Sequence, residues 1–256
     1  CSDNFSVSSI KKATDLSEAT NGDSLLDEVR LTSSRIKQQL RGIVQSARQE
    51  QYMTTRRGSK LDRNKLTRLA FADSRVFQQR KVESQAVNTA IHILGDMSGS
   101  MSPWGGEDKA KVARESALAL SVALQAIPGC NPAVTYFKDS RLYSALKHGG
   151  RIKAGKFICY GDGGTPMADA IWYAAHQMQK LPEQRKLIVV ISDGAPDCEA
   201  DVHSVRRLCE QSGFEFIGIG IGDETIKRLF GQSIVINEVG HLQKTLFQLV
   251  GKALIN

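Results

Sequence analysis

The sequence has 256 residues, of which 41% are hydrophobic, 24% charged and 6% aromatic, a composition typical of a soluble globular protein. No stretch approaches the ~20 uninterrupted apolar residues that a membrane-spanning helix requires, which excludes an integral membrane protein of that type. The five cysteines are odd in number and show no C-x-x-C spacing. They favour reduced thiols in a cytoplasmic protein over a disulfide framework or a zinc site.

The net charge of +7 is concentrated in one segment near the N-terminus. Residues 30–81 carry 14 Lys and Arg against 3 Asp and Glu, whereas residues 1–29 carry 2 against 6. The remaining residues, 82–256, are balanced at 18 against 18. This uneven distribution indicates two functional parts.

The first 83 residues predict a lead-in followed by a basic helical extension. Residues 1–22 are rich in Ser, Thr, Asn and Asp and are typical of a disordered segment. Apolar residues recur at helical spacing from residue 23 to about 52, and the opposite face is basic, which predicts an amphipathic helix. A second helical pattern covers residues 61–71, and residues 75–84 are expected to form an extended arm. We expect the extension, residues 23–83, to pack back on the domain that follows.

From residue 84 onward the pattern alternates between strands and helices. Strands are predicted over residues 90–95, 133–137, 186–191, 214–221 and 233–236, with residues 141–147 as an antiparallel edge. Helices are predicted over residues 109–127, 166–178, 201–211 and 241–254. This alternation predicts a doubly wound, mostly parallel α/β sheet with helices on both faces, Rossmann-like in layout, over residues 84–256. Such sheets bind ligands at the carboxyl ends of their strands.

Three polar segments follow predicted strands or open predicted helices at that end of the sheet. In D-M-S-G-S, Asp96, Ser98 and Ser100 alternate, so their oxygens point the same way if the chain leaves the strand nearly extended. G-G-T-P places Thr165 on a glycine loop, and S-D-G places Asp193 after the most apolar strand. A cluster of carboxylate and hydroxyl oxygens suits Mg²⁺ and not a soft metal.

The order D-x-S-G-S, G-T-P and S-D-G resembles the metal-ion-dependent adhesion site of von Willebrand A-type domains. The resemblance implies that Ser98, Ser100 and Thr165 bind the metal directly, and that Asp96 and Asp193 bind it directly or through water. It also implies an open coordination position for a carboxylate of a partner. Mg²⁺ is the expected ion, with Mn²⁺ as the alternative.

Three further residues are expected to contact the partner: Trp104, Met101 and Met167. Trp104 follows the first metal loop in S-P-W-G-G and is expected on the rim of the site, where a tryptophan can anchor a partner. Packing of the loop onto the domain explains Trp104 equally well, since one tryptophan buries a large area.

A narrower resemblance concerns the large accessory subunit of cobalt chelatases. It is carried by I-S-D-G-A-P at residues 191–196, by F-I-G-I-G-I-G at residues 216–222, and by residues 60–66 and 75–77 ahead of the metal loop. The resemblance implies that the chain works with an AAA+ ATPase of the MoxR or chelatase type. The specific version is metal insertion into a tetrapyrrole, as in cobalamin biosynthesis.

The sequence therefore predicts a Mg²⁺-dependent protein-binding module that is not an enzyme by itself, because no paired acid, base and nucleophile stand out. No P-loop motif is present, so the chain is not itself a P-loop ATPase. Two alternatives remain: a stand-alone adhesion or scaffold module, and a nucleic-acid-binding protein that acts through the basic helix at residues 30–48.

Overall fold

We describe the protein from a computed structural model. The residues that the structure describes are 11–20, 22–30, 34, 38, 51–55, 57, 60–61, 77–81, 88–102, 108–236 and 241–253.

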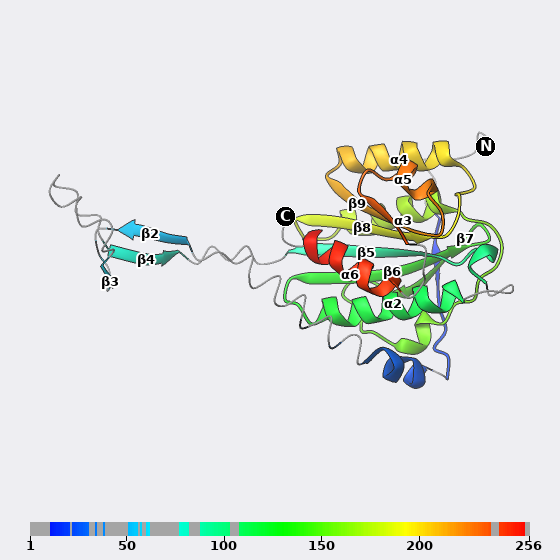
Figure 1. Cartoon of the computed structure of the whole chain (residues 1–256), viewed down its shortest axis with the longest axis horizontal. Helices are drawn as coiled ribbons and strands as arrows, with labels where there is room; N and C mark the ends of the chain where they lie inside the picture. The colour runs from blue at the N-terminus through cyan, green and yellow to red at the C-terminus, as the bar shows by residue number, and fades with distance from the viewer. Residues whose placement is uncertain are drawn as a thin grey trace.

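The domain is built on one seven-stranded sheet, which Figure 1 shows between two layers of helices. In spatial order its strands are β1 (Ala13–Asp15), β7 (Arg141–Leu146), β6 (Cys130–Lys138), β5 (Thr89–Asp96), β8 (Arg185–Ser192), β9 (Phe214–Ile221) and β10 (Ser233–Ile236). β6 and β7 are antiparallel, and every other neighbouring pair is parallel. The predicted doubly wound, mostly parallel sheet is confirmed.

The helices divide between the two faces of the sheet. They are α2 (Lys109–Gln125), α3 (Met167–Gln179), α4 (Glu199–Gln211), α5 (Thr225–Leu229) and α6 (Leu242–Ala253), with short 3₁₀ turns η2 (Gly99–Met101) and η3 (Ala154–Phe157). α2 and α6 share one hydrophobic cluster with the sheet, and α3, α4 and α5 share the other. Strands alternating with helices produce this sandwich because each amphipathic helix must bury its apolar face on the sheet.

The central strand β5 explains how both clusters form from one run of residues. All eight of its residues are buried. Ile91 and Ile93 face the α2 side, while Ala90 and Leu94 face the α3 side, as the two-residue period of a strand dictates. A strand that is apolar on both faces is typical of the centre of a parallel sheet. Its carboxyl end, at Asp96, therefore has a rigid base.

The lead-in contributes a strand that the sequence did not predict. β1 pairs in parallel with β7, with Ala13 opposite Leu142, so β7 is not the edge of the sheet. Ion pairs link Lys147 to Asp15 and Lys153 to Glu18 at 2.7 Å. The expectation of disorder throughout residues 1–22 is therefore wrong for this strand. Composition could not reveal it, because the strand depends on the open backbone groups of a sheet edge far along the chain.

The basic extension is helical only in part. Residues 22–30 are helical, and Val29, which is 2% exposed, packs in the cluster below α2. However, β2 (Gln51–Thr55), β4 (Phe77–Lys81) and β3 (Lys60–Leu61) form a second, three-stranded antiparallel sheet. The prediction of helix is wrong at residues 51–52 and 61, and the extended arm is a strand at residues 77–81. The helical spacing of apolar residues contains no information about such long-range strand pairing. Most of the remainder of these predicted helices lies outside the described residues.

The thiols also differ from expectation. Cys130, Cys159 and Cys209 are free, but Cys198 is disulfide-bonded, so the prediction of reduced thiols is wrong for that residue. An odd number of cysteines without local motifs still allows one long-range pair, because a disulfide requires only two Cα atoms within about 7 Å. In the part of the chain described above, no helix has the length and apolar character needed to cross a bilayer.

Candidate metal centre

The first loop of the site begins at the last residue of β5. Asp96 is fully buried and Ser98 is 3% exposed. The two carboxylate oxygens of Asp96 accept hydrogen bonds from the backbone N–H of Ser98, at 2.8 Å, and from Ser192 Oγ, at 2.5 Å. The backbone N–H of Met97 donates to the carbonyl of Phe137 on the neighbouring strand. These bonds hold the loop against the ends of two adjacent strands.

Four of the five predicted metal residues form a connected cluster. Ser98 Oγ and Ser100 Oγ are 3.0 Å apart, and Ser100 Oγ donates to Asp193 Oδ1 at 2.6 Å. Ser192, beside Asp193 at the end of β8, joins the cluster to Asp96. The two hydroxyls of the first loop therefore lie side by side and Ser100 meets the carboxylate, although Gly99–Met101 form the 3₁₀ turn η2 and not the nearly extended chain on which the prediction depended.

The glycine loop brings Thr165 to the same end of the sheet. The carbonyl of Gly163 accepts from the backbone N–H of Gly99 at 3.0 Å, and the backbone N–H of Asp162 donates to the carbonyl of Met97 at 2.8 Å. Thr165 itself is 8% exposed. Backbone hydrogen bonds therefore hold the first loop and the glycine loop together.

Asp197 fixes the backbone of Thr165. Its carboxylate accepts from the Thr165 N–H at 2.8 Å, and its own N–H donates to the Thr165 carbonyl at 3.1 Å. The sequence allowed Asp197 to add hydrogen bonds around the site but favoured a solvated loop charge, because a single acid on a predicted loop is usually solvated. The only sequence signal for this role was the position of an aspartate four residues after Asp193.

A lysine also reaches the site. Lys109, the first residue of α2, donates from Nζ to Asp193 Oδ2 at 2.8 Å. The Asp193 side chain is fully buried, and that of Lys109 is 33% exposed. No local sequence signal could reveal this pair, since the two residues are 84 positions apart.

The donor set fits a hard divalent cation. Burial raises the pKa of Asp96 to about 6, and the neighbouring carboxylate of Asp193 adds to the rise, while hydrogen bonds from Ser192 and Ser98 oppose it. Such a carboxylate gains strongly from a cation beside it. Within the described ranges, no three His, Cys, Asp or Glu side chains gather to hold a metal, so an ion here must also use the hydroxyls. Two carboxylates and three hydroxyls are the oxygen donors that Mg²⁺ and Mn²⁺ prefer.

The residues expected to contact a partner need correction. Met101 and Met167 are both fully buried and pack in the clusters on opposite faces of the sheet. Each follows a polar loop directly, and its apolar side chain turns inward to anchor that loop, so neither offers a surface to a partner in this structure. Trp104 lies outside the described residues.

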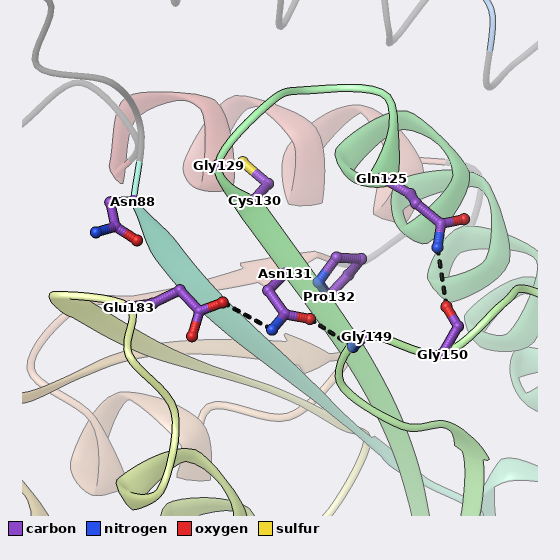
Figure 2. Close-up of a pocket in the computed structure, with 9 residues that line it drawn as sticks. All are labelled: Asn88, Gln125, Gly129, Cys130, Asn131, Pro132, Gly149, Gly150 and Glu183. Atoms are coloured by element: carbon purple, nitrogen blue, oxygen red, sulfur yellow. Dashed lines mark hydrogen bonds between the residues drawn. The ribbon is translucent and has the colours of Figure 1, made fainter.

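A polar pocket of about 350 Å³, drawn in Figure 2, lies at the amino ends of β5 and β6, opposite the carboxyl ends that carry the metal loops. It is lined by the starts of β5 and β6 and the loops beside them, including Asn88, Cys130 and Asn131. The Glu183 carboxylate accepts from the Asn131 side chain at 2.8 Å. None of the predicted metal residues lines this pocket, which is therefore separate from the metal loops.

Comparisons with known proteins agree with this fold. The model of the family "von Willebrand factor type A domain" matches residues 151–234, which include Thr165 and Asp193. A search of curated proteins finds no match.

Similar solved structures include the PilB minor pilin from Streptococcus sanguinis, with a TM-score of 0.56 and 14% identity over 71% of this chain and 65% of that one. Proximal thread matrix protein 1 from the mussel byssus has a TM-score of 0.54 and 17% identity over 66% and 46%. The manganese-loaded TRAP protein of Plasmodium vivax has a TM-score of 0.50 and 16% identity over 66% and 74%. The chain thus spans less than two thirds of the first two proteins, and at these identities the likeness shows the fold alone.

Fold and site together define a doubly wound α/β domain with its polar loops gathered at the carboxyl ends of the strands. Within this domain, residues 151–234 match the model of the von Willebrand factor type A domain. The narrower relation to the cobalt chelatase subunit stays a prediction.

Proposed function

We propose that this chain is a Mg²⁺-dependent protein-binding module, in which an acidic side chain of the partner completes the coordination of the metal. The observation that carries this proposal is the hydrogen-bonded cluster of Ser98, Ser100 and Asp193 beside the buried Asp96. Four oxygen-bearing side chains lie together there at the carboxyl ends of β5 and β8, although the loops that carry them are almost a hundred residues apart.

Each residue of the site has a proposed role. Ser98, Ser100 and Thr165 would bind the ion directly, while Asp96 and Asp193 would bind it directly or through water. A bound divalent cation supplies a Lewis-acidic position that an incoming carboxylate can occupy. The manganese in the similar TRAP structure supports a hard divalent ion, and we propose Mg²⁺ with Mn²⁺ as the alternative.

The partner that we propose is an AAA+ ATPase of the MoxR or chelatase type, with this chain as its accessory subunit in metal chelation or complex remodelling. The support is the resemblance carried by I-S-D-G-A-P and G-I-G-I-G. The structure gives the second segment a packing role as well: an added Cβ on Gly218 would lie 2.8 Å from Phe230, and one on Gly220 would lie 2.8 Å from Ile226. Those glycines let α5 lie close to β9, so packing alone explains them. The I-S-D-G-A-P segment therefore supports the proposed partner more strongly than the glycine segment does.

An affinity pull-down with Mg²⁺ tests the proposal. The wild type is compared with Asp96→Ala, and with Asp27→Ala as a matched control, since Asp27 is an exposed carboxylate on the helix at residues 22–30. We expect an AAA+ ATPase to be captured by the wild type and by Asp27→Ala, and to be lost with Asp96→Ala or with EDTA.

Each other result identifies a different function. Metal-dependent capture of a protein that is not an ATPase would support a stand-alone adhesion or scaffold module. Capture of nucleic acid alone, equally by all three forms, would contradict the metal-dependent proposal and point to the basic residues 30–81.

A further inference from the structure

The buried carboxylate of Asp193 is already engaged on both oxygens. Oδ1 accepts the hydroxyl of Ser100 at 2.6 Å, and Oδ2 accepts the ammonium of Lys109 at 2.8 Å. The first contact is to a proposed metal ligand, and the second is to a full positive charge. An ion that takes Asp193 as a ligand must therefore share this carboxylate with a cation that the protein itself supplies.

The position of Lys109 is not explained by its own helix. It is the first residue of the 17-residue helix α2, and the N-terminus of a helix disfavours positive charge. Asp108 caps α2 and its carboxylate accepts from the backbone N–H of Lys111, but the first turn itself has no acidic residue, whereas the first turn of α3 has Asp169 and that of α4 has Glu199. Asp193 is the group that stabilises the ammonium of Lys109 at this place.

The ion pair also has the geometry of an exchangeable contact. The Asp193 side chain is fully buried, but one third of the Lys109 side chain is exposed to solvent. An ammonium on a flexible stem can swing into water, while the carboxylate stays at the end of β8. A lysine and a divalent cation drawn to one carboxylate repel each other, so the presence of one weakens the binding of the other.

We propose that Lys109 is a resident counter-cation that competes with the divalent metal for Asp193 and so sets the metal affinity of the site. This inference rests on the metal site of the proposed function. In the metal-free protein Lys109 neutralises a buried charge and keeps the loops in place. When the metal binds, the ammonium is released toward solvent at the rim, where the acidic group of a partner would arrive.

The test is a calorimetric titration of Mg²⁺ into wild type, Lys109→Gln and Lys111→Gln. Glutamine keeps a hydrogen-bond donor for Asp193 but removes the charge. Lys111 is the matched control because it lies on the same turn, is half exposed and pairs only loosely with Glu115, at 3.7 Å. We expect Lys109→Gln to bind Mg²⁺ roughly tenfold more tightly than the wild type, which corresponds to about 1.4 kcal/mol. Lys111→Gln should match the wild type.

A second measurement follows Lys109 itself. Reductive methylation of Lys109, quantified by mass spectrometry, should be slow without metal, because the ion pair protects the amine, and faster with saturating Mg²⁺. The rate at Lys111 should not change. Circular dichroism of each variant establishes that it is folded before either measurement.

The outcomes separate this inference from the proposed function. If the wild type binds Mg²⁺ and Lys109→Gln binds it equally or more weakly, Lys109 orients Asp193 and does not compete, and only the inference fails. If neither protein binds Mg²⁺, both the inference and the metal-dependent function fail. Binding by Lys109→Gln alone would support competition by Lys109 but would contradict Mg²⁺-dependent function of the wild type.

Discussion

At the scale of single residues, Asp96 combines a functional role with a cost in stability. Burial raises its pKa to about 6, so at pH 7.5 the folded protein carries an ionised carboxylate whose burial costs free energy. The resulting loss of stability grows as the pH rises from 3.8, the ordinary pKa of an aspartate, to about 6. Above that pH the loss is complete.

Asp96→Asn should therefore stabilise the metal-free protein. The variant removes the buried charge and keeps an oxygen for the Ser98 N–H. We expect the free energy of unfolding in EDTA to rise by about 1–3 kcal/mol, since one pKa unit corresponds to about 1.4 kcal/mol. The stabilisation of the wild type by Mg²⁺ should disappear in the variant. Denaturant unfolding with and without Mg²⁺ measures both effects, and a less stable variant in EDTA would show that the hydrogen bonds outweigh the charge.

A second residue-scale feature is a buried histidine pair. His148 Nδ1 lies 3.0 Å from the carbonyl of Asn131, His148 Nε2 lies 3.3 Å from His92 Nδ1, and His92 Nε2 lies 2.9 Å from Thr135 Oγ1. These partners are satisfied if the Thr135 hydroxyl donates to His92, His92 donates to His148, and His148 donates to the carbonyl. Protonation of His148 at Nε2 would break its bond to His92, because both facing nitrogens would then carry hydrogen.

The pair should make the protein sensitive to acid. Burial lowers the pKa of His148 to about 4 and that of His92 well below its ordinary 6.5. The unfolded chain therefore binds protons first, so stability is complete above about pH 6.5 and falls as pH drops from there toward 4.

His148→Gln should reduce the slope of the free energy of unfolding against pH by up to about 1.4 kcal/mol per pH unit between pH 6.5 and 4, the acid limb of the stability curve. Denaturant unfolding at a series of pH values gives the slope. An unchanged slope would mean that carboxylates, and not this histidine, govern the acid limb.

At the scale of elements, the glycine loop before α3 sets where Thr165 stands. Gly163 has a φ of 69°, and an added Cβ there would lie 2.6 Å from the Cβ of Asp139. Both the left-handed backbone and the close approach require glycine. The loop is thereby held tightly enough for the Gly163 carbonyl to meet the Gly99 N–H.

Gly163→Ala should lower both stability and metal affinity, because the loop must move away from Asp139. Gly213→Ala is the matched control: its φ is 82°, but an added Cβ would meet nothing within 4 Å. We expect the control to cost about 1 kcal/mol from strain alone, and Gly163→Ala to cost more. Thermal melts and Mg²⁺ titrations compare them, and equal effects on both readouts would contradict the packing argument.

The elements also show what sequence could predict. Apart from the short helix α5, which was not predicted, the strands and helices after residue 88 were predictable because each carries its own period and its own turn residues, as β9 at Phe214–Ile221 does. β1 and the three-stranded sheet were not, since short strands are specified by distant partners and not by local pattern.

The same distinction holds for the site. Asp96, Ser98 and Ser100 were predictable because their alternation is local, and Asp193 because it ends the most apolar strand. Lys109 was missed and Asp197 was taken more readily as a solvated charge, since their roles arise from contacts across many residues of chain. The inward packing of Met101 and Met167 was missed because a methionine beside a polar loop reads equally as surface or as core.

At the scale of the whole molecule, the sheet separates two polar regions. The metal loops stand at the carboxyl ends of β5 and β8, and the pocket around Asn131 stands at the opposite ends. A partner that docks on the metal loops through an acidic group therefore leaves the other end of the domain free. The charge of the chain from residue 82 onward is balanced, so electrostatic attraction of an acidic partner to the domain depends on the local cations, above all the metal and Lys109.

The proposed function depends on the binding of a divalent cation by the predicted oxygens. The most direct measurement is a calorimetric titration of Mg²⁺ into the wild type and Thr165→Val. Valine matches the shape of threonine and keeps the backbone bonds to Asp197, but it removes the hydroxyl. We expect one saturable site in the wild type and strongly weakened binding in the variant, with the fold retained. Equal binding by both proteins, or none by the wild type, would contradict it.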